Sequence, residues 1–372
     1  MTGNPFEYDA GDSIMYHNAA ISVLLHGYNN LGSGLWGLGL SDSGFPFYLS
    51  LIYFVFGDHV IIPRLLNALM GAWTVVLVYR LAGRNFGEAA GRLAGIMMML
   101  MPNLIYYCGI HLKETLMVFL LVAFMERADL LLRRKIRVAD LFVVAALGAA
   151  MFFFRTVLLA SMLFALFSMV LFIRRPGASW LQRSIIGLWV VITVWFTFSY
   201  RIQAEFEYLL DNIDAQEANM EFKAKREGGN RLATYGSSVV FAPAMFVAPF
   251  PTFVNISTQQ TQMMLSGGYF VKNVLAFFVV ISLISFIRKR QLRKYILILS
   301  FLLAYLAILA QSSFALSERF HLPALPFLII LAAYGITRVN FKNQRFYIPY
   351  LALMVLVVIA WNVFKLAGRG GI

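Results

Sequence analysis

The chain has a single cysteine, Cys108, among its 372 residues. One thiol cannot form a disulfide within the chain, and it cannot supply the paired cysteines of a zinc ribbon or zinc finger. The sequence therefore excludes a fold held together by disulfides and a cysteine-based zinc site.

Charged residues are also scarce. They make up 13% of the chain, whereas hydrophobic residues make up 60%. Soluble domains carry about 25% charged residues. This composition excludes a water-soluble globule and predicts an integral membrane protein.

Lysine and arginine are absent from the first 63 residues, although the chain contains 31 of them and has a net charge of +13. Basic residues collect in the short cytoplasmic loops of membrane proteins. The opening segment is therefore expected outside the cytoplasm. The same rule accounts for the positive charge, so we expect no nucleic-acid partner.

Apolar runs long enough to cross a bilayer, roughly 17–25 residues, predict an all-α polytopic membrane protein with about ten transmembrane helices. The basic connections between these runs fall on one side, which the positive-inside rule places in the cytoplasm. An amino-terminal segment outside the cytoplasm needs a preceding hydrophobic helix to carry it across the membrane. We therefore expect a first transmembrane helix to be missing before residue 1. The predicted spans are 60–80, 88–107, 114–131, 138–154, 156–174, 183–200, 268–288, 294–311, 321–337 and 346–366.

The pattern predicts a single membrane domain over residues 1–372. Residues 1–59 are expected to form a first external loop with interfacial helices, including 44–57, which is apolar but too short to span. Six spans follow in 60–200. The long external loop 201–267 and four further spans in 268–372 complete the predicted domain.

Ionisable residues gather at the predicted outer ends of the helices and are nearly absent from the helix interiors. Ion-coupled carriers usually keep such groups near the membrane midplane. The distribution therefore favours chemistry at the outer membrane surface over a central transport path. The residues are Asp9, Asp12, Lys113, Glu114, Arg155, Arg201, Glu318 and Arg319.

Three strings resemble one family. DSIMYHNAA, from Asp12, resembles a D-E-x-x-Y-x-x-x-A pattern, although Ser13 replaces the second acid, for which Asp9 is a candidate substitute. GFPFYLSLIYFVFGDHVIIPRLLNAL and SERFHLPALPF are similar to the G-x-P-x-x-Y and E-R-Y-x-x-P-x-x-P patterns. The family is the GT-C lipid-phosphate-dependent glycosyltransferases, of the protein O-mannosyltransferase (glycosyltransferase family 39) and aminoarabinose-transferase type.

The resemblance implies a GT-C-like fold and transfer of a sugar from a polyprenyl-phosphate donor to a lipid, glycan or protein acceptor. The site would face the exterior of the plasma membrane, and a one-step displacement would invert the anomeric centre. A phosphate leaving group needs little protonation, so the enzyme mainly needs a carboxylate base and cations around the phosphate.

By this resemblance Asp12 is the expected catalytic base, with Glu114 or Asp9 as a second acid. Arg319, Arg155 and Lys113 are the expected phosphate ligands. Three of these residues have a structural alternative: Asp12 as a helix N-cap, Glu114 as an acid favoured by a helix N-terminus, and Arg155 as a snorkelling interfacial residue.

A divalent cation would suit the phosphate, and Asp9, Asp12, His17 and His111 are weak candidate ligands without a diagnostic spacing. Two other functions stay open. An O-antigen polymerase or ligase also combines many helices with a long external loop. A lipid or sugar transporter would move its substrate without forming a covalent product.

Overall fold

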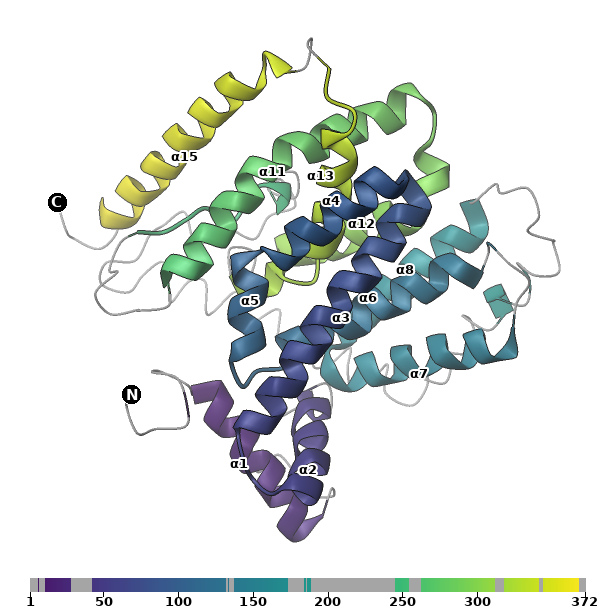
Figure 1. Ribbon diagram of the computed structural model, residues 1–372, viewed down its shortest axis with the longest axis vertical. Coiled ribbons are helices and arrows are strands. Elements are labelled where there is room, and N and C mark those ends of the chain that lie inside the picture. Colours follow the sequence, from purple (N-terminus) through teal and green to yellow (C-terminus); the bar gives the residue numbers. More distant parts are fainter. Residues whose placement is uncertain are drawn as a thin grey trace.

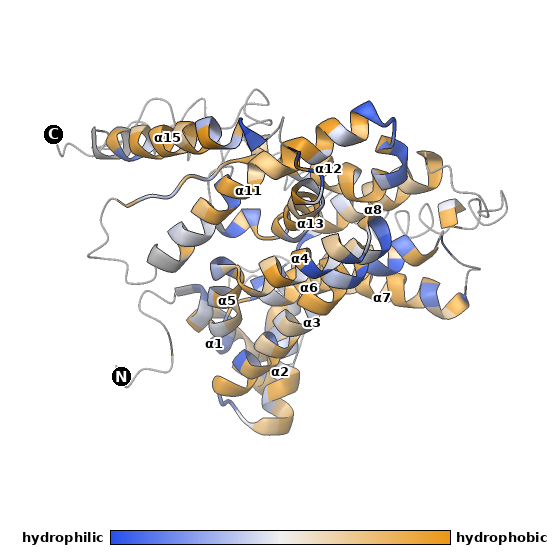
Figure 2. Cartoon of the chain, turned by 45° about the horizontal axis from the view of Figure 1, so that its top comes forward, coloured by the Kyte–Doolittle hydropathy of each residue, from blue (hydrophilic) through white to orange (hydrophobic). Residues whose placement is uncertain are grey.

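The structure is a computed structural model. It describes residues 6, 11–27, 42–131, 133, 137–172, 184, 186–188, 245–253, 262–311, 318–340 and 344–367. Within these ranges the regular elements are all helices, and hydrophobic residues dominate them (Figures 1 and 2). The all-α membrane fold predicted from the sequence is confirmed.

Figure 1 labels the α-helices that the structure describes. In order they are α1 (Gly11–His26), α2 (Gly44–Phe56), α3 (Ile61–Phe86), α4 (Glu88–Met99), α5 (Pro102–Gly109), α6 (Glu114–Leu131), α7 (Val138–Phe154), α8 (Thr156–Phe172), α11 (Gln262–Arg288), η6 (Leu292–Tyr295), α12 (Ile296–Gln311), η7 (Glu318–His321), α13 (Leu325–Ile336) and α15 (Tyr347–Ala367).

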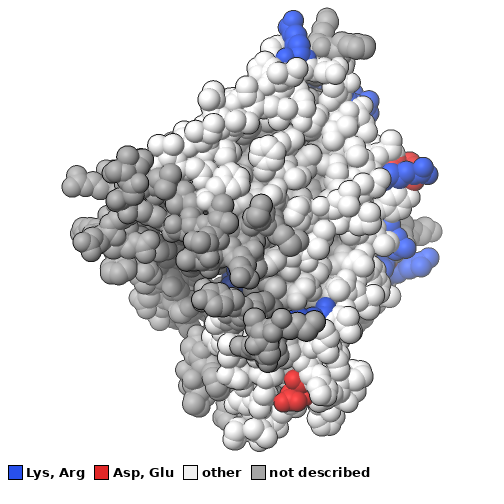
Figure 3. All heavy atoms as spheres, turned by 60° about the vertical axis from the view of Figure 1, so that its left-hand side comes forward, with Lys and Arg blue, Asp and Glu red and all other residues white. Residues whose placement is uncertain are grey.

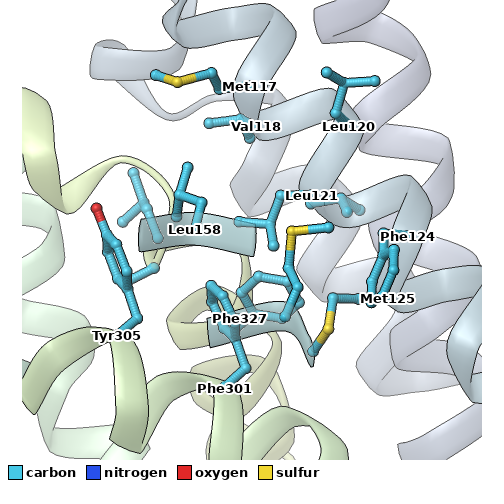
Figure 4. Close-up of a cluster of buried hydrophobic side chains, with 14 of the residues drawn as sticks. Met117, Val118, Leu120, Leu121, Phe124, Met125, Leu158, Phe301, Tyr305 and Phe327 are labelled. Carbon is cyan, nitrogen blue, oxygen red and sulfur yellow. The ribbon is translucent and has the colours of Figure 1, made fainter. Parts of the chain in front are cut away.

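Helix α6 lies at the centre of the molecule. Almost all of its residues are buried, and it packs against α3, α7, α8 and α12. Its apolar side chains, among them Leu121 and Phe124, lie near Leu158, Phe301 and Phe327 from α8, α12 and α13 (Figure 4). A helix that is hydrophobic on all sides is typical of the interior of a bundle.

Three described helices are long and apolar enough to cross a membrane: α3, α11 and the combined η6–α12 segment. The other predicted spans also coincide with described helices, except 183–200, which lies almost wholly outside the described residues. The face seen in Figure 3 has a broad expanse without charged side chains, and Lys and Arg appear along its edges. An uncharged belt of this kind suits contact with lipid.

Two predicted segments differ in detail from the helices of the structure. The predicted span 88–107 is a pair of helices, α4 and α5, that meet at an angle of 51°. The break has a clear cause, because Pro102 occupies the first turn of α5 and cannot continue α4. Helix α11 begins at Gln262, inside the predicted external loop 201–267, because its first residues extend the apolar run by more than a turn.

The region predicted to be the first external loop contains a pair of helices. Helices α1 and α2 pack against each other at the lower end of the molecule in Figure 1, and α2 also contacts α3 and α7. Residues 44–57 were predicted to be helical, and α2 confirms this. The pair places Asp12 within reach of Arg319, which also contacts Glu114 in the first turn of α6.

The far end of α6 carries an ion-pair cluster. Arg84 binds Glu126 at 2.6 Å and Asp129 at 3.3 Å, and Arg133 binds Asp129 at 2.8 Å. Both carboxylates are buried, so each needs a cationic partner to offset the loss of water. The cluster ties α3 to α6 about 20 Å along the helix axis from Glu114.

Helices α11 and α13 approach closely at Gly335. A Cβ atom added there would collide with the backbone carbonyl of Phe278 on α11. Ser282 strengthens the same contact, because its hydroxyl donates a 2.6 Å hydrogen bond to the carbonyl of Leu331. Absence of a side chain at residue 335 is therefore what lets the two helices meet.

We predict that Gly335→Ala lowers the free energy of unfolding by about 1–3 kcal/mol, the usual cost of overpacking. Gly267→Ala on α11 is the matched control, since a Cβ there meets nothing within 4 Å. The control is expected to be neutral or stabilising. Thermal unfolding of both variants in detergent measures the difference, and equal midpoints would contradict the close α11–α13 packing.

Candidate functional site

The centre of the site is Arg319. Its Nε donates to Oε1 of Glu114, and its Nη1 donates to Oδ2 of Asp12. The three residues come from η7, α6 and α1, which are far apart in the sequence. Folding thus brings together three residues that the sequence had singled out as catalytic base, second acid and phosphate ligand.

Helix geometry explains where the two carboxylates lie. Asp12 is in the first turn of α1, and Glu114 is the first residue of α6. The positive end of the helix dipole favours acids at both positions. The carboxylates nevertheless differ in access, because the Asp12 side chain is 51% exposed whereas that of Glu114 is 1% exposed. Asp12 therefore can meet a substrate from solvent.

The Glu114 carboxylate has one oxygen that lacks a hydrogen bond. Oε1 receives the Arg319 bond, but Oε2 is buried and has no partner among the described residues. A buried carboxylate oxygen without a donor is costly. This oxygen is accordingly a place where a bound molecule would gain a strong hydrogen bond.

Arg319 remains a cation in this setting. Burial alone would lower its pKa, but the carboxylates of Glu114 and Asp12 outweigh burial and raise it. Its two bonds use two of the five N–H donors of a guanidinium. The group is thus able to contact an anion while it still holds both carboxylates.

Lys113 forms a second ion pair beside the first. Its Nζ donates to Oδ1 of Asp42 and lies 5.7 Å from the centre of the Tyr16 ring. Burial lowers the pKa of Lys113, and the Asp42 carboxylate offsets part of that effect. Tyr16 is also buried, and burial together with Asp42 and Glu114 raises the pKa of its phenol. Tyr16 is therefore a neutral side chain that lies near both ion pairs.

Arg155 approaches the same site from the junction between α7 and α8. Its guanidinium carbon lies 4.3 Å from the centre of the Phe320 ring, which neighbours Arg319 in η7. The Phe320 carbonyl accepts a 2.6 Å hydrogen bond from the Tyr305 hydroxyl. The three predicted phosphate ligands thus lie in the same part of the molecule, near η7 and the first turn of α6.

The two histidines proposed as metal ligands meet at a tyrosine. The Tyr53 hydroxyl lies 2.8 Å from Nδ1 of His17 and 3.2 Å from Nε2 of His111. Asp12 bonds to Arg319 instead, and Asp9 lies outside the described residues. In the part of the chain that the structure describes, no three His, Cys, Asp or Glu side chains are grouped to hold a metal ion.

An apolar groove opens beside the cations, between α2, α6 and α7. It has a volume of about 590 Å³, and its lining is almost wholly hydrophobic. We call it the α2–α7 groove. Its walls include Phe47, Tyr48 and Leu51 of α2, Leu116 and Leu120 of α6 and Phe153 of α7.

Sequence reasoning missed two residues of the site, Asp42 and Tyr16. Asp42 stands two residues before the GFPF string in a segment without basic residues, and Tyr16 is the tyrosine of the DSIMYHNAA string. Both positions can be seen in the sequence, but neither of them predicts a contact with Lys113. Of the other predicted outer charges, Arg201 and the side chain of Glu318 lie outside the described part.

Comparisons with known proteins confirm the resemblance to GT-C glycosyltransferases. Residues 44–201 match the family model described as dolichyl-phosphate-mannose-protein mannosyltransferase. No curated protein matches the chain.

The fold is similar to crystal structures of ArnT from Cupriavidus metallidurans. With the form bound to undecaprenyl phosphate, the TM-score is 0.55 at 15% identity, over 93% of this chain and 59% of that one. With the apo form, the TM-score is 0.51 at 14% identity, over 93% and 58%. The chain thus spans less than two thirds of these proteins, and the likeness is one of fold.

We predict that His111 makes stability depend on pH. Burial, with Arg64 and His17 nearby, lowers the pKa of His111 to about 3. Below pH 6.5 the unfolded chain therefore binds a proton here that the folded chain does not bind. This contribution to stability is complete above pH 6.5 and is lost as the pH falls towards 3, at up to about 1.4 kcal/mol per pH unit.

The measurement compares unfolding of the wild type and His111→Gln in detergent between pH 8 and pH 4. The stability advantage of the wild type over this variant is expected to shrink as the pH falls. His59→Gln, at an exposed position, is the control and should follow the wild type. A variant curve parallel to the wild type would show that His111 titrates normally.

Proposed function

We propose that the protein is a membrane glycosyltransferase that moves a sugar from a polyprenyl-phosphate donor to a lipid, glycan or protein acceptor. The reaction takes place at the outer face of the plasma membrane and inverts the anomeric centre. The observation that carries the proposal is the Asp12–Arg319–Glu114 arrangement beside the cations Lys113 and Arg155.

The cations suit a phosphate group. Arg319 has unused N–H donors, and guanidinium groups bind phosphate oxygens through paired hydrogen bonds. Lys113 and Arg155 lie close enough to influence each other electrostatically. Two neighbouring cations repel each other, and an anion that binds between them offsets this repulsion. The ArnT structure of similar fold contains undecaprenyl phosphate, which supports a polyprenyl phosphate as the anion.

The hydrocarbon part of the donor fits the α2–α7 groove. Phe153 and Phe154 line this groove, and Arg155 follows them directly in the chain. Leu116 lines it as well, three residues after Lys113. A lipid chain in the groove would thus end near the two cations, where its phosphate is neutralised.

Asp12 is suited to act as the general base. Its carboxylate is half exposed and is held in place by Arg319. An acceptor hydroxyl attacks the anomeric carbon, and Asp12 takes the hydroxyl proton as the new C–O bond forms. The bond from the anomeric carbon to the phosphate oxygen breaks, and the polyprenyl phosphate leaves with the electron pair. Arg319 stabilises the charge that develops on it.

The charge distribution supports the orientation. Arg84, Arg127 and Arg133 gather near the end of α6, and five basic residues lie in residues 288–294. Basic residues of this density are typical of the cytoplasmic side. The carboxylates of the site lie at the opposite end of α6, which corresponds to the outer face.

We predict that Asp12→Asn lowers kcat for sugar transfer by about 10²–10⁴-fold, the usual contribution of a general base. Asparagine keeps an oxygen for the Arg319 bond, so the donor KM should change little. Transfer from a radiolabelled polyprenyl-phosphate sugar in purified membranes measures both constants. Activity near that of the wild type would rule out Asp12 as the base.

Arg319→Ala is predicted to raise the donor KM at least about tenfold, because a lost charged hydrogen bond is worth about 1.5–3 kcal/mol. Arg92→Ala is the matched control, since Arg92 is exposed and pairs only with the exposed Glu88 among the described residues. The control should keep the wild-type KM. A variant of Arg319 that lowers expression but keeps the donor KM would assign this residue a purely structural role.

A further inference from the structure

A second cavity opens on the other side of α6, between α3, α4 and α5. It has a volume of about 200 Å³, and most of its lining is apolar. We call it the α3–α5 pocket. Its walls include Ala68, Gly71 and Ala72 of α3, Met98 of α4, Cys108 of α5 and Glu114 of α6.

Small residues create this pocket. Ala68 and Ala72 are exposed, and the large apolar side chains of Leu69 and Trp73 beside them are more than half exposed. On a helix that faces lipid, these neighbours would lie among hydrocarbon chains. The pocket is therefore open to the membrane at Ala68 and Ala72, and Glu114 of the site is part of its lining.

The groove and the pocket lie on opposite faces of one helix. Leu116 and Leu120 of α6 line the α2–α7 groove, whereas Thr115 and Val118 line the α3–α5 pocket. With 3.6 residues per turn, these two pairs point in nearly opposite directions. Two chains entering from the membrane would thus reach the first turn of α6 from different sides.

The two cavities end at groups of opposite charge. The α2–α7 groove leads towards Lys113 and Arg155, which favour an anion. The α3–α5 pocket reaches Glu114, whose buried Oε2 has no hydrogen-bond partner among the described residues. A carboxylate oxygen only accepts hydrogen bonds, so it selects a hydroxyl or an ammonium group.

We propose that the α3–α5 pocket binds the hydrocarbon chain of a lipid acceptor, whose hydroxyl or amino group donates a hydrogen bond to Oε2 of Glu114. This inference rests on the proposed function and assigns the acceptor to the lipid class. Donor and acceptor chains then flank α6. Arg319 bonds to both Glu114 and Asp12, so an acceptor group bound at Glu114 would lie near the proposed base.

The single cysteine gives a direct test, because Cys108 lines the pocket and is partly exposed. The full chain in lipid nanodiscs is treated with methyl methanethiosulfonate in the presence of dodecanol, dodecylamine or dodecanoate. The reagent converts the thiol to a methyl disulfide and releases methanesulfinate. The alcohol and the amine are expected to slow Cys108 modification by about tenfold at ten times their Kd. Dodecanoate is expected to leave the rate unchanged, because Glu114 repels its carboxylate.

Variants locate the effect. Ala68→Leu fills the pocket and is expected to abolish protection, whereas Ala150→Leu, which fills the α2–α7 groove, keeps it. Glu114→Gln is expected to weaken protection by the amine more than protection by the alcohol. Rates are compared with and without each additive for the same variant, so altered access to Cys108 cancels.

Equal protection by dodecanoate, or no protection by any of the three, would overturn the proposal. Protection that survives Ala68→Leu would do so as well. The assay needs no sugar donor, so it gives its result even if sugar transfer fails. Absence of transfer with normal protection would count against the proposed function while leaving the lipid pocket in place.

Discussion

The guanidinium of Arg319, held between two carboxylates, is the contact on which the site depends. Glu114 is almost fully buried at the start of α6, and a buried carboxylate without a cation would be strongly destabilising. Arg319 supplies the cation and also binds the more exposed Asp12. One side chain of η7 thereby joins α1, which also packs on α2, to the central helix. The contact holds the Asp12 carboxylate near Glu114, which follows Lys113 directly in the chain.

Helix α6 extends this constraint through the molecule. Its first residue belongs to the site, its middle packs on α8 and α12, and its last turns hold the Arg84 cluster. Because both ends are fixed by ion pairs, the helix can carry a cavity on each face without shifting. The two cavities lie near groups of opposite charge. Under the proposed function, this difference would give a donor phosphate and an acceptor hydroxyl separate routes to the site.

Much of the fold was predictable, because long apolar runs such as those of α3, α6 and α11 leave few alternatives in a membrane. The boundaries failed where local chemistry intervenes, as at Pro102, which breaks one predicted span into α4 and α5. Asp12, Glu114 and Arg319 were identified from their positions at helix starts and from the family pattern. Their mutual contact was not predictable, since 307 residues separate Asp12 from Arg319. The pairing of Asp42 with Lys113 and the pocket formed by Ala68 and Gly71 depend in the same way on tertiary packing.

The central claim is that this charge arrangement transfers a sugar and does not merely bind or move one. The most direct measurement supplies membranes with a radiolabelled polyprenyl-phosphate sugar of known anomeric configuration and determines the linkage in the product by NMR. The account predicts a covalent product in which the configuration of the anomeric carbon is inverted. A product with retained configuration, or label that crosses the bilayer without forming any covalent product, would contradict it.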